Sequence, residues 1–361
     1  MGDGFTPGLL HDARMLFDGR IESVVLMTSR IAIHGQGIAA RCCAALLCEQ
    51  QARILPAETS RPRLPAVLIS DGTQALLREI FQKEKLFEGL PKIRKRVVAW
   101  NGAKAETFPH SAVIVGEQAI GERLQAPVPA STSDRPDEAE WNIFTSKGSD
   151  ELAPVRRFGS RLASVVEVML RESAKKDACW AESVDSGWLF LIATGNGTGS
   201  LICTGGEPAS LLQGSRLVCE QIETLNGGPR AAQFAAYPRT LAKLHGRGWI
   251  ACGTAAMSFD PLSGEGTGAA VRQAILAAAT VRAVLRGDDA DGVLAEFSLR
   301  LRLGFLRHLE MCRTFYQVKS NDSFWSRELA MLDDGISWVR KEIGEQPAPR
   351  YKLVDFDLVR P

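Results

Sequence analysis

Apolar residues are spaced as in strands through the first two thirds of the chain and as in helices after it. Short apolar runs that end at Gly, Asn, Asp or Pro predict strands. The expected strands cover residues 52–56, 96–100, 111–115, 165–171, 188–194, 199–204 and 249–252. Residues 269–342 instead repeat apolar positions at the helical spacing, with breaks near Gly287 and Ser320. We therefore expect a run of long helices there.

Four other stretches complete the pattern. Helical spacing predicts two further helices, over residues 73–85 and 209–224. Residues 124–156 are rich in Pro, Ser, Asp and Glu and are expected to form a loop. The chain ends in a proline-containing segment that is expected to be a tail.

A first glycine cluster lies between an apolar run and a helix-like segment. The apolar run begins at Arg30 and ends at Gly35, and Gly37 and Ala40 follow it. In a dinucleotide-binding turn, the first glycine allows the sharp turn and the second lets a pyrophosphate approach, while a small third residue permits close packing. Glu58, 23 residues after Gly35, is placed to accept hydrogen bonds from a ribose. The candidate cofactor-binding residues here are Gly35, Gly37, Ile38, Ala39, Ala40 and Glu58.

A second glycine cluster follows the expected strand at 249–252. The strand stops at Gly253, a loop carries Asp260-Pro261-Leu262, and further glycines open an alanine-rich helix. Free N–H groups and the positive dipole end at such a helix start suit a phosphate or the negative charge of a reduced flavin. The candidate residues of this segment are Gly253, Thr254, Pro261, Gly264, Gly266 and Thr267.

Taken together, the two clusters resemble the flavoprotein monooxygenase and tryptophan-halogenase superfamily, in which both ends of the chain hold one FAD. The resemblance implies an α/β fold, with a split Rossmann-like FAD-binding domain, an inserted β-rich substrate domain and a helical C-terminal region. The corresponding domains are an N-terminal extension (1–28), the FAD-binding domain (29–90 and 246–290), the substrate domain (91–245), and the helical region with its tail (291–361). Thr254 stands where the family has Asp, so it brings a hydroxyl for the ribityl chain but no charge.

Two segments bear on the reaction. Halogenases of this superfamily carry Trp-x-Trp-x-Ile-Pro on a strand of the inserted domain, whereas the matching segment here has Trp188, then Phe190 and Ala193. This departure favours oxygen transfer from a flavin C4a-hydroperoxide over halide oxidation, with Trp188 and Phe190 on the substrate side. Halogenases also use a lysine to guide hypohalous acid. Lys92, eight residues before Trp100, falls near that position by spacing and is the catalytic candidate. A solvated strand edge also explains the basic run that contains it.

The sequence of the loop at residues 260–263 points to one subgroup of this superfamily. Asp260-Pro261-Leu262-Ser263 is most similar to flavoproteins that hydroxylate a tryptophan in a partner polypeptide during quinone-cofactor biogenesis. This implies a polypeptide substrate, O2 as co-substrate, and FAD reduced by NAD(P)H directly or through a separate flavin reductase. Trp141 and Phe144 in the expected loop are candidates for docking that partner. A halogenase, a small-molecule aromatic hydroxylase and a flavin-binding chaperone stay open as alternatives.

The composition of the chain argues against several classes of partner and ligand. The net charge is +1, from 43 basic and 42 acidic residues, which argues against a nucleic-acid or membrane-surface partner. The sequence has no run of about 18 apolar residues and no secretory signal pattern at its start, so a cytoplasmic location is expected. The eight cysteines form no Cys-x-x-Cys pair and the five histidines are scattered, so no metal site is expected.

Overall fold

The computed structural model describes residues 31–50, 52–56, 63–125, 139–146, 151–226, 232–345 and 350–360. The expected N-terminal extension (1–28) and the candidate ribose ligand Glu58 lie outside these residues.

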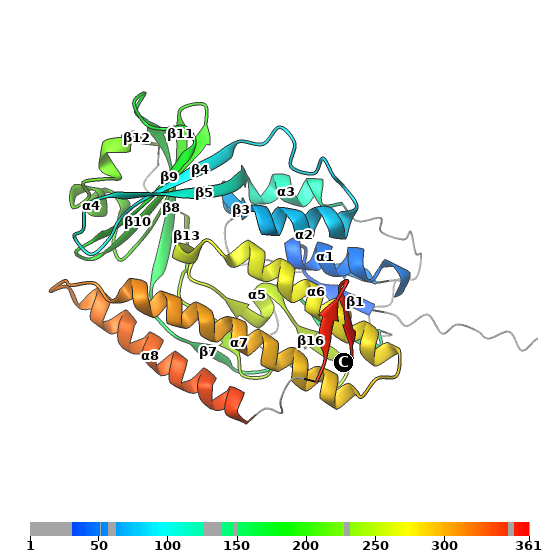
Figure 1. Ribbon diagram of the computed structural model, residues 1–361. Helices are drawn as coiled ribbons and strands as arrows, with labels where there is room; N and C mark the ends of the chain where they lie inside the picture. Colours follow the sequence, from blue (N-terminus) through cyan, green and yellow to red (C-terminus); the bar gives the residue numbers. More distant parts are fainter. Residues whose placement is uncertain are drawn as a thin grey trace, which may run out of the picture.

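A mainly parallel five-stranded sheet lies at the end of the molecule that carries the first glycine cluster (Figure 1). Its order is β15-β16-β6-β1-β2, and only β15 runs antiparallel to its neighbour. The strands are β1 (Ile31–His34), β2 (Arg53–Leu55), β6 (Trp141–Phe144), β15 (His245–Gly246) and β16 (Trp249–Ala251). Ile33, Ile143 and Ile250 are fully buried, as expected for strands covered on both faces. Helix α1 (Ile38–Leu46) packs against helix α6 (Gly266–Leu285) beside this sheet.

Strand β6 corrects two expectations. The segment 124–156 was expected to be a loop, but Trp141–Phe144 forms a strand between β1 and β16. Trp141 is only 8% exposed, so it is part of the core and is not free to dock a partner. The four-residue run was missed because polar segments flank it on both sides. The parallel sheet therefore takes a strand from within residues 91–245.

A larger sheet forms the second layer, with order β12-β8-β11-β10-β9-β4-β5-β3 and with β13 also paired to β8. Its strands are β3 (Val67–Ser70), β4 (Lys92–Ala99), β5 (Glu106–Val115), β8 (Leu162–Leu170), β9 (Ala178–Val184), β10 (Gly187–Gly195), β11 (Thr198–Thr204), β12 (Ile222–Asn226) and β13 (Ala232–Ala235). Strand β3 belongs to this sheet although residues 29–90 were assigned to the other domain, so the two sheets do not divide at residue 90. The β4–β5 turn lies at Asn101 and Gly102, both with positive φ, as hairpin turns require.

Alternate side chains of β10 enter different cores. Trp188, Phe190 and Ile192 belong to the core shared with the parallel sheet and the C-terminal helices. Leu189 and Leu191 belong to a smaller core on the other face of the large sheet. The period of two in this strand therefore directs Trp188 and Phe190 toward the rest of the molecule.

The prediction of a helix over residues 209–224 is mostly wrong. Helix α4 (Pro208–Gln213) is followed by a loop, the short 3-10 helix η3 (Cys219–Gln221) and strand β12. The buried carboxylate of Glu182 accepts hydrogen bonds from the backbone N–H groups of residues 216–218 and from the Ser215 hydroxyl. A helix would use these N–H groups internally, so the buried charge ends α4.

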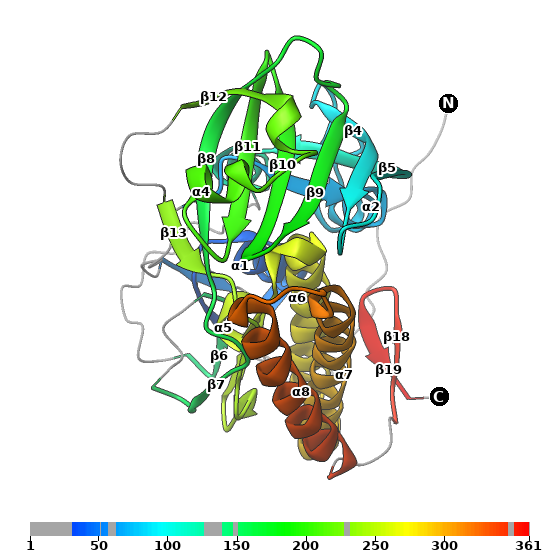
Figure 2. The same ribbon diagram turned by 90° about the vertical axis from the view of Figure 1, so that its left-hand side faces the viewer.

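The helical C-terminal region is confirmed. After α6 come α7 (Ala290–Tyr316) and α8 (Ser323–Gly344), separated near Gly287 and Ser320. Figure 2 shows α7 and α8 side by side beneath the large sheet. Helix α6 is long and apolar enough to span a membrane, but 67% of its apolar window is buried within the protein, so it serves as a core helix.

The remaining elements are short. They are helices α2 (Asp71–Phe81), α3 (Glu117–Arg123) and α5 (Gly253–Ala256), the 3-10 helices η1 (Cys48–Gln50) and η4 (Pro261–Ser263), a sheet of β7 (Val155–Arg157), β14 (Arg239–Leu241) and β17 (Met257–Ser258), and a hairpin of β18 (Lys352–Val354) and β19 (Asp357–Val359). The hairpin lies where an unstructured tail was expected. The predicted fold class, an α/β fold with a parallel sheet, a β-rich part and C-terminal helices, is confirmed.

Candidate active site

Three parallel strands end at the same edge of the five-stranded sheet. The chain leaves β1 at Gly35, β6 at Thr145 and β16 at Cys252. Hydrogen bonds join these ends, because Thr145 N donates to His34 O (2.9 Å) and Cys252 N donates to Phe144 O (2.8 Å). The carboxyl edge of such a sheet is where α/β proteins bind nucleotide cofactors. The two glycine clusters, more than 200 residues apart in sequence, meet at this edge.

Gly35 and Gly253 are required by the geometry of this edge. Gly35 has φ +131°, and a Cβ there would collide with the Thr145 hydroxyl. Gly253 has φ +58°, and its Cβ would lie 2.9 Å from Ala39 Cβ and from Thr145 O. At both positions a side chain is excluded, because the positive φ disfavours residues other than glycine and because no space is left for a Cβ atom. The small Ala39 and the fully buried Ala40 let α1 approach this closely.

Gly37 and the start of α1 form an open cradle beside these crowded positions. A Cβ at Gly37 would have no described heavy atom within 4 Å. Helix α1 begins at the half-buried Ile38, with no side-chain cap and no acidic residue in its first turn. The hydroxyl oxygen of Ser146 is buried beside Gly35 and has no hydrogen-bond partner among the described residues. Free N–H groups, space and an unpaired hydroxyl together fit an anionic pyrophosphate.

The second helix start has the same character. Gly264 has φ +68° and ends η4, and Gly266 then opens α6 into space with no described heavy atom within 4 Å of its Cβ position. Helix α6 also lacks a side-chain cap and an acidic residue in its first turn. Thr267 is half-buried and Gly266 is exposed. These N–H groups are available to a negatively charged group.

Thr254 follows Gly253 at the start of α5. It is exposed, its hydroxyl donates a long hydrogen bond to Thr145 O (3.4 Å), and its carbonyl accepts one from Arg239 (2.7 Å). The side chain is therefore accessible to a ligand at the sheet edge.

A buried ion network holds the loop that leads to α6. Asp260, fully buried, accepts hydrogen bonds from Arg161 Nε and Nη2 (2.9 and 2.7 Å) and from the backbone N–H of Leu262 (2.9 Å). Arg161 also donates through Nη1 to the buried Glu328 of α8 (2.6 Å). Burial opposes the charge of Arg161, but Tyr316, Asp260 and Glu328 raise its pKa above its ordinary value. Paired in this way, the charges fix Pro261 and η4 in place.

Tyr316 joins this network to the large sheet. Its hydroxyl donates to Asp260 Oδ2 (2.7 Å) and accepts from Trp188 Nε1 (2.9 Å). Trp188 is fully buried, so its indole is a core residue that connects β10, through Tyr316, to the loop at Asp260. The candidate substrate-side tryptophan and the candidate flavin loop are thus two hydrogen bonds apart.

His308 lies under the same loop. Its Nε2 accepts a hydrogen bond from the backbone N–H of Asp260 (2.9 Å), which requires that nitrogen to be unprotonated. Burial lowers the pKa of His308 to about 4, with Asp260 acting against the shift and Arg161 adding to it. The Cys312 thiol lies 3.4 Å away, and its own pKa is raised by burial. The neutral imidazole is therefore part of the support for η4.

This histidine gives a pH-dependent stability. The pKa of His308 is about 4 when folded and about 6.5 when unfolded, so the unfolded state binds the proton first as the pH falls. We expect His308 to contribute a loss of about 3 kcal/mol in unfolding free energy between pH 7 and pH 4. Urea titrations of the wild type and of His308→Gln at pH 7 and pH 4 measure this loss of unfolding free energy. Gln is a suitable replacement because its side chain can accept the hydrogen bond from Asp260 N–H and does not titrate. Equal losses in both proteins would contradict the assignment.

Lys92 and Arg96 lie in different surroundings on β4. Lys92, the first residue of the strand, is exposed and has no hydrogen bond or ion pair with a described residue. Arg96 lies four residues further along. A Cβ at Gly264 would be 3.4 Å from Arg96 Nη2, and the guanidinium carbon lies 5.7 Å from the centre of the Phe190 ring. Arg96 is therefore the β4 cation that adjoins both η4 and the candidate substrate wall.

Sequence reasoning missed Arg96 and its neighbour His110. Arg96 Nη2 lies 3.5 Å from His110 Nε2, the Cys179 thiol is a further hydrogen-bond partner of the guanidinium, and Arg96 Nε is buried with no partner among the described residues. Burial and the charge of Arg96 lower the pKa of His110, while Asp71 acts against this shift. A neutral His110 and a guanidinium with one unused N–H leave hydrogen-bonding capacity for a ligand. The basic run of β4 was the only sequence signal, and it did not separate Arg96 from its neighbours.

No group of three or more His, Cys, Asp or Glu side chains suited to a metal occurs among the described residues. Cys43 and Cys252 lie close together in the core, with sulfur atoms 4.0 Å apart. The pKa of Cys43 is raised by its hydrogen bond to Cys252 and by burial, so this thiol stays protonated.

Solved structures of flavin enzymes share this architecture. The halogenase CmlS aligns with a TM-score of 0.70 at 17% identity, over 89% of this chain and 71% of that chain. The chain has the fold of flavin-dependent halogenases and monooxygenases. QhpG, a peptidyl tryptophan dihydroxylase essential for tryptophylquinone cofactor biogenesis, aligns with a TM-score of 0.63 at 21% identity, over 83% of this chain and 78% of that chain. The p-nitrophenol 4-monooxygenase PnpA from Pseudomonas putida DLL-E4 aligns with a TM-score of 0.59 at 15% identity, over 88% of this chain and 98% of that chain.

No protein-family model matches the sequence, and no curated protein sequence matches it. The likeness is therefore one of fold. Within that fold, the residues of the two cradles fit FAD. Gly37 leaves space and free N–H groups for the pyrophosphate, Ser146 offers an unpaired hydroxyl, and the start of α6 offers N–H groups for the flavin.

Proposed function

We propose that the protein is a cytoplasmic FAD-dependent monooxygenase that hydroxylates an indole ring, the substrate being a tryptophan residue of a partner polypeptide. The observation that carries this proposal is the meeting of the Gly35 and Gly253 turns at one sheet edge beside the uncapped start of α1, with the Trp188–Tyr316–Asp260 chain joining the η4 loop to the large sheet. The similarity to QhpG supports the polypeptide substrate. The loop sequence Asp260-Pro261-Leu262-Ser263 supports the same choice.

Each part of the site has a role in this proposal. Gly35 and Gly37 bind the ADP half, and Gly253 and Thr254 hold the ribityl chain, Thr254 through its hydroxyl. Gly266 and Thr267 present N–H groups that stabilise negative charge on the flavin, after a turn in which Gly264 N donates to Pro261 O (3.0 Å). Bound FAD supplies the reduced flavin that activates O2.

The substrate side is formed by the large sheet. Trp188 and Phe190 form an apolar wall that excludes water from the reacting ring. Arg96 and the neutral His110 orient the substrate by hydrogen bonds. One oxygen atom of O2 enters the aromatic ring and the other leaves as water, with two electrons from NAD(P)H, delivered directly or through a separate flavin reductase.

Hydroxylation is preferred to halogenation on two observations. Phe190 and Ala193 interrupt the halogenase strand motif. The cation beside Gly264 is Arg96, and Lys92 is exposed four residues earlier, at the start of the strand. An arginine stays protonated and cannot readily act as a nucleophilic amine toward hypohalous acid.

Product analysis tests this function. Purified protein is incubated with FAD, a reductant, air, chloride and tryptophan-containing peptides, and the peptides are analysed by mass spectrometry. We expect added oxygen and no added chlorine. Lys92→Ala should keep most of the turnover, whereas Arg96→Leu should lower it by about tenfold or more, because one charge-assisted hydrogen bond is removed.

Lys95→Ala, an exposed change on the same strand, is the control for the Arg96 variant. A chlorinated peptide without added oxygen, together with loss of turnover in Lys92→Ala, would establish a halogenase instead. A protein that binds no FAD would leave the chaperone alternative.

A further inference from the structure

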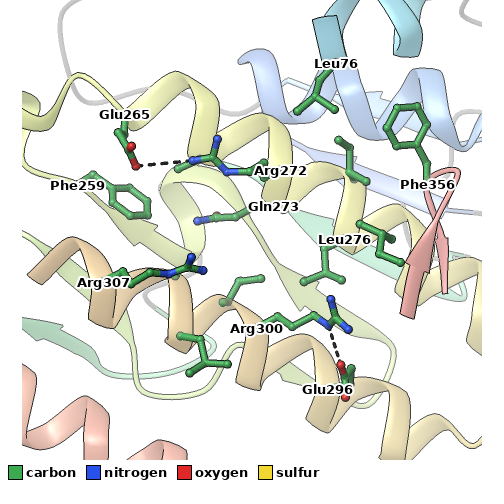
Figure 3. Close-up of a pocket in the computed structure, with 16 residues that line it drawn as sticks. Leu76, Phe259, Glu265, Arg272, Gln273, Leu276, Glu296, Arg300, Arg307 and Phe356 are labelled. Atoms are coloured by element: carbon green, nitrogen blue, oxygen red, sulfur yellow. Dashed lines mark hydrogen bonds and ion pairs between the residues drawn. The ribbon is translucent and has the colours of Figure 1, made fainter. Parts of the chain in front are cut away.

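A groove of about 670 Å³ lies between α2, α6, α7 and the β18–β19 hairpin (Figure 3). One end is bounded by Phe259 and Glu265, the residues that flank the η4 loop on either side. The far end is bounded by Phe356 at the tip of the hairpin. Gly264, which Arg96 approaches, is the sequence neighbour of Glu265. The groove thus begins beside the candidate active site and runs away from it along α6 and α7.

The groove is fixed in shape by the hairpin. Arg282 of α6 and Arg286, the residue that follows this helix, both pair with Asp357 of the hairpin. Arg300 of α7 donates to Tyr351 O, immediately before the hairpin (2.6 Å). These bonds attach the C-terminal segment to both helices, so binding in the groove needs no large ordering of the chain.

Exposed apolar side chains gather at this groove. The described residues include nine large apolar side chains that are exposed, and five of them lie on α7 and the hairpin: Leu303, Phe315, Leu353, Val354 and Val359. Leu303 and Leu353 line the groove itself, beside the less exposed Leu276 and Leu301. Such a concentration of exposed apolar surface marks an interaction site.

The groove also carries an uncompensated positive charge. Arg272 pairs with Glu265 (3.7 Å) and Arg300 pairs with Glu296 (2.6 Å). Arg307 is exposed at the groove and has no ion pair with a described residue. Figure 3 shows Arg307 near the end occupied by Phe259. A carboxylate is the complementary group at that position.

We infer that this groove binds the polypeptide substrate, through apolar side chains against Leu276, Leu301 and Leu353 and through a carboxylate against Arg307. The occupant is thus an apolar and acidic segment next to the tryptophan that is modified. The inference rests on the proposed function, and it adds the chemical character of the polypeptide and the surface that selects it. A small aromatic substrate would need neither the length of the groove nor the unpaired arginine.

Peptide pools test the groove without turnover. Three fluorescein-labelled synthetic pools contain one central tryptophan, with the other positions drawn from Leu and Glu, from Leu and Lys, or from Ser and Glu. Fluorescence anisotropy with the wild-type protein should show the Leu/Glu pool binding about tenfold more tightly than either other pool. Arg307→Glu and Leu303→Glu should each remove most of that preference.

Matched controls separate the groove from general charge effects. Lys341→Glu makes the same charge change at an exposed position of α8, and Leu162→Glu makes the same apolar-to-acidic change at a 53% exposed position of β8. Both should bind the Leu/Glu pool as the wild type does. Equal binding of the three pools, no binding of the Leu/Glu pool, or self-association through the groove in sedimentation experiments would overturn the inference.

The outcome is distinguishable from failure of the proposed function. FAD titration and oxygen transfer to the tryptophan-containing peptides of the product analysis are measured on the same proteins. Normal FAD binding and hydroxylation with unselective peptide binding would reject only the groove. Absence of FAD binding with intact peptide selectivity would reject the monooxygenase and leave a peptide-binding protein.

Discussion

Replacing Gly37 by Asp is expected to abolish FAD binding and leave the fold intact. Gly37 is the N-cap of α1, in extended backbone conformation, with open space around its Cβ position. Asp is a favourable N-cap residue, so the helix should be as stable as before or slightly more stable. Its carboxylate would occupy the space assigned to the pyrophosphate. One like charge at about 4 Å costs about 4 kcal/mol at an effective dielectric constant of about 20, which predicts a loss of more than about 100-fold in affinity.

Flavin fluorescence titration and thermal unfolding measure the two effects separately. Gly37→Asn has nearly the same size and no charge, so it should weaken FAD binding less. Gly344→Asp places the same charge in open space at the end of α8 and should bind FAD normally. Full FAD occupancy in Gly37→Asp would disprove the assignment of the N-terminal cradle.

The second large effect is expected from Arg161→Met. This change leaves the carboxylates of Asp260 and Glu328 buried, both with 0% side-chain exposure, without their shared cation. Removing one partner of a buried ion pair costs about 3–5 kcal/mol. We expect a fall of that size in the unfolding free energy measured by denaturant titration. Because Asp260 also holds the turn at Pro261, FAD affinity should fall as well.

A combined variant shows whether the cause is electrostatic. Arg161→Met with Asp260→Asn and Glu328→Gln has no unpaired buried charge, so it should recover most of the lost stability. Arg313→Met, which breaks an exposed pair with Asp333, should change stability by less than about 1 kcal/mol. If the triple variant were no more stable than Arg161→Met alone, lost packing of the arginine would be the cause instead.

Local chemistry made the glycine turns predictable from the sequence. Gly35 and Gly253 adopt positive φ in crowded surroundings, and few other residues tolerate such positions. The breaks near Gly287 and Ser320 were likewise visible, because they interrupt a long helical period. These features depend on neighbours within a few residues, which a sequence displays directly.

Features that depend on distant residues could not be predicted. Glu182 ends α4 by binding N–H groups more than 30 residues later. Arg161 finds its partners at Asp260 and Glu328, 99 and 167 residues away. Lys92 and Arg96 belong to one basic run, and only the approach of Gly264 in three dimensions singles out Arg96. The roles of these cations and of the cofactor-binding residues stay predictions.

The strand order of the parallel sheet also determines when that sheet can form during synthesis. Ile31 pairs with Trp141, and Asn142 pairs in turn with Trp249, so the sheet needs three segments made at widely separated times. By contrast, β9, β10 and β11 are consecutive and pair as hairpins soon after they are made. A nascent chain that stops before Trp249 presents β6 as an unpaired edge, which favours aggregation. The cofactor cradle should therefore appear late, after the large sheet has folded.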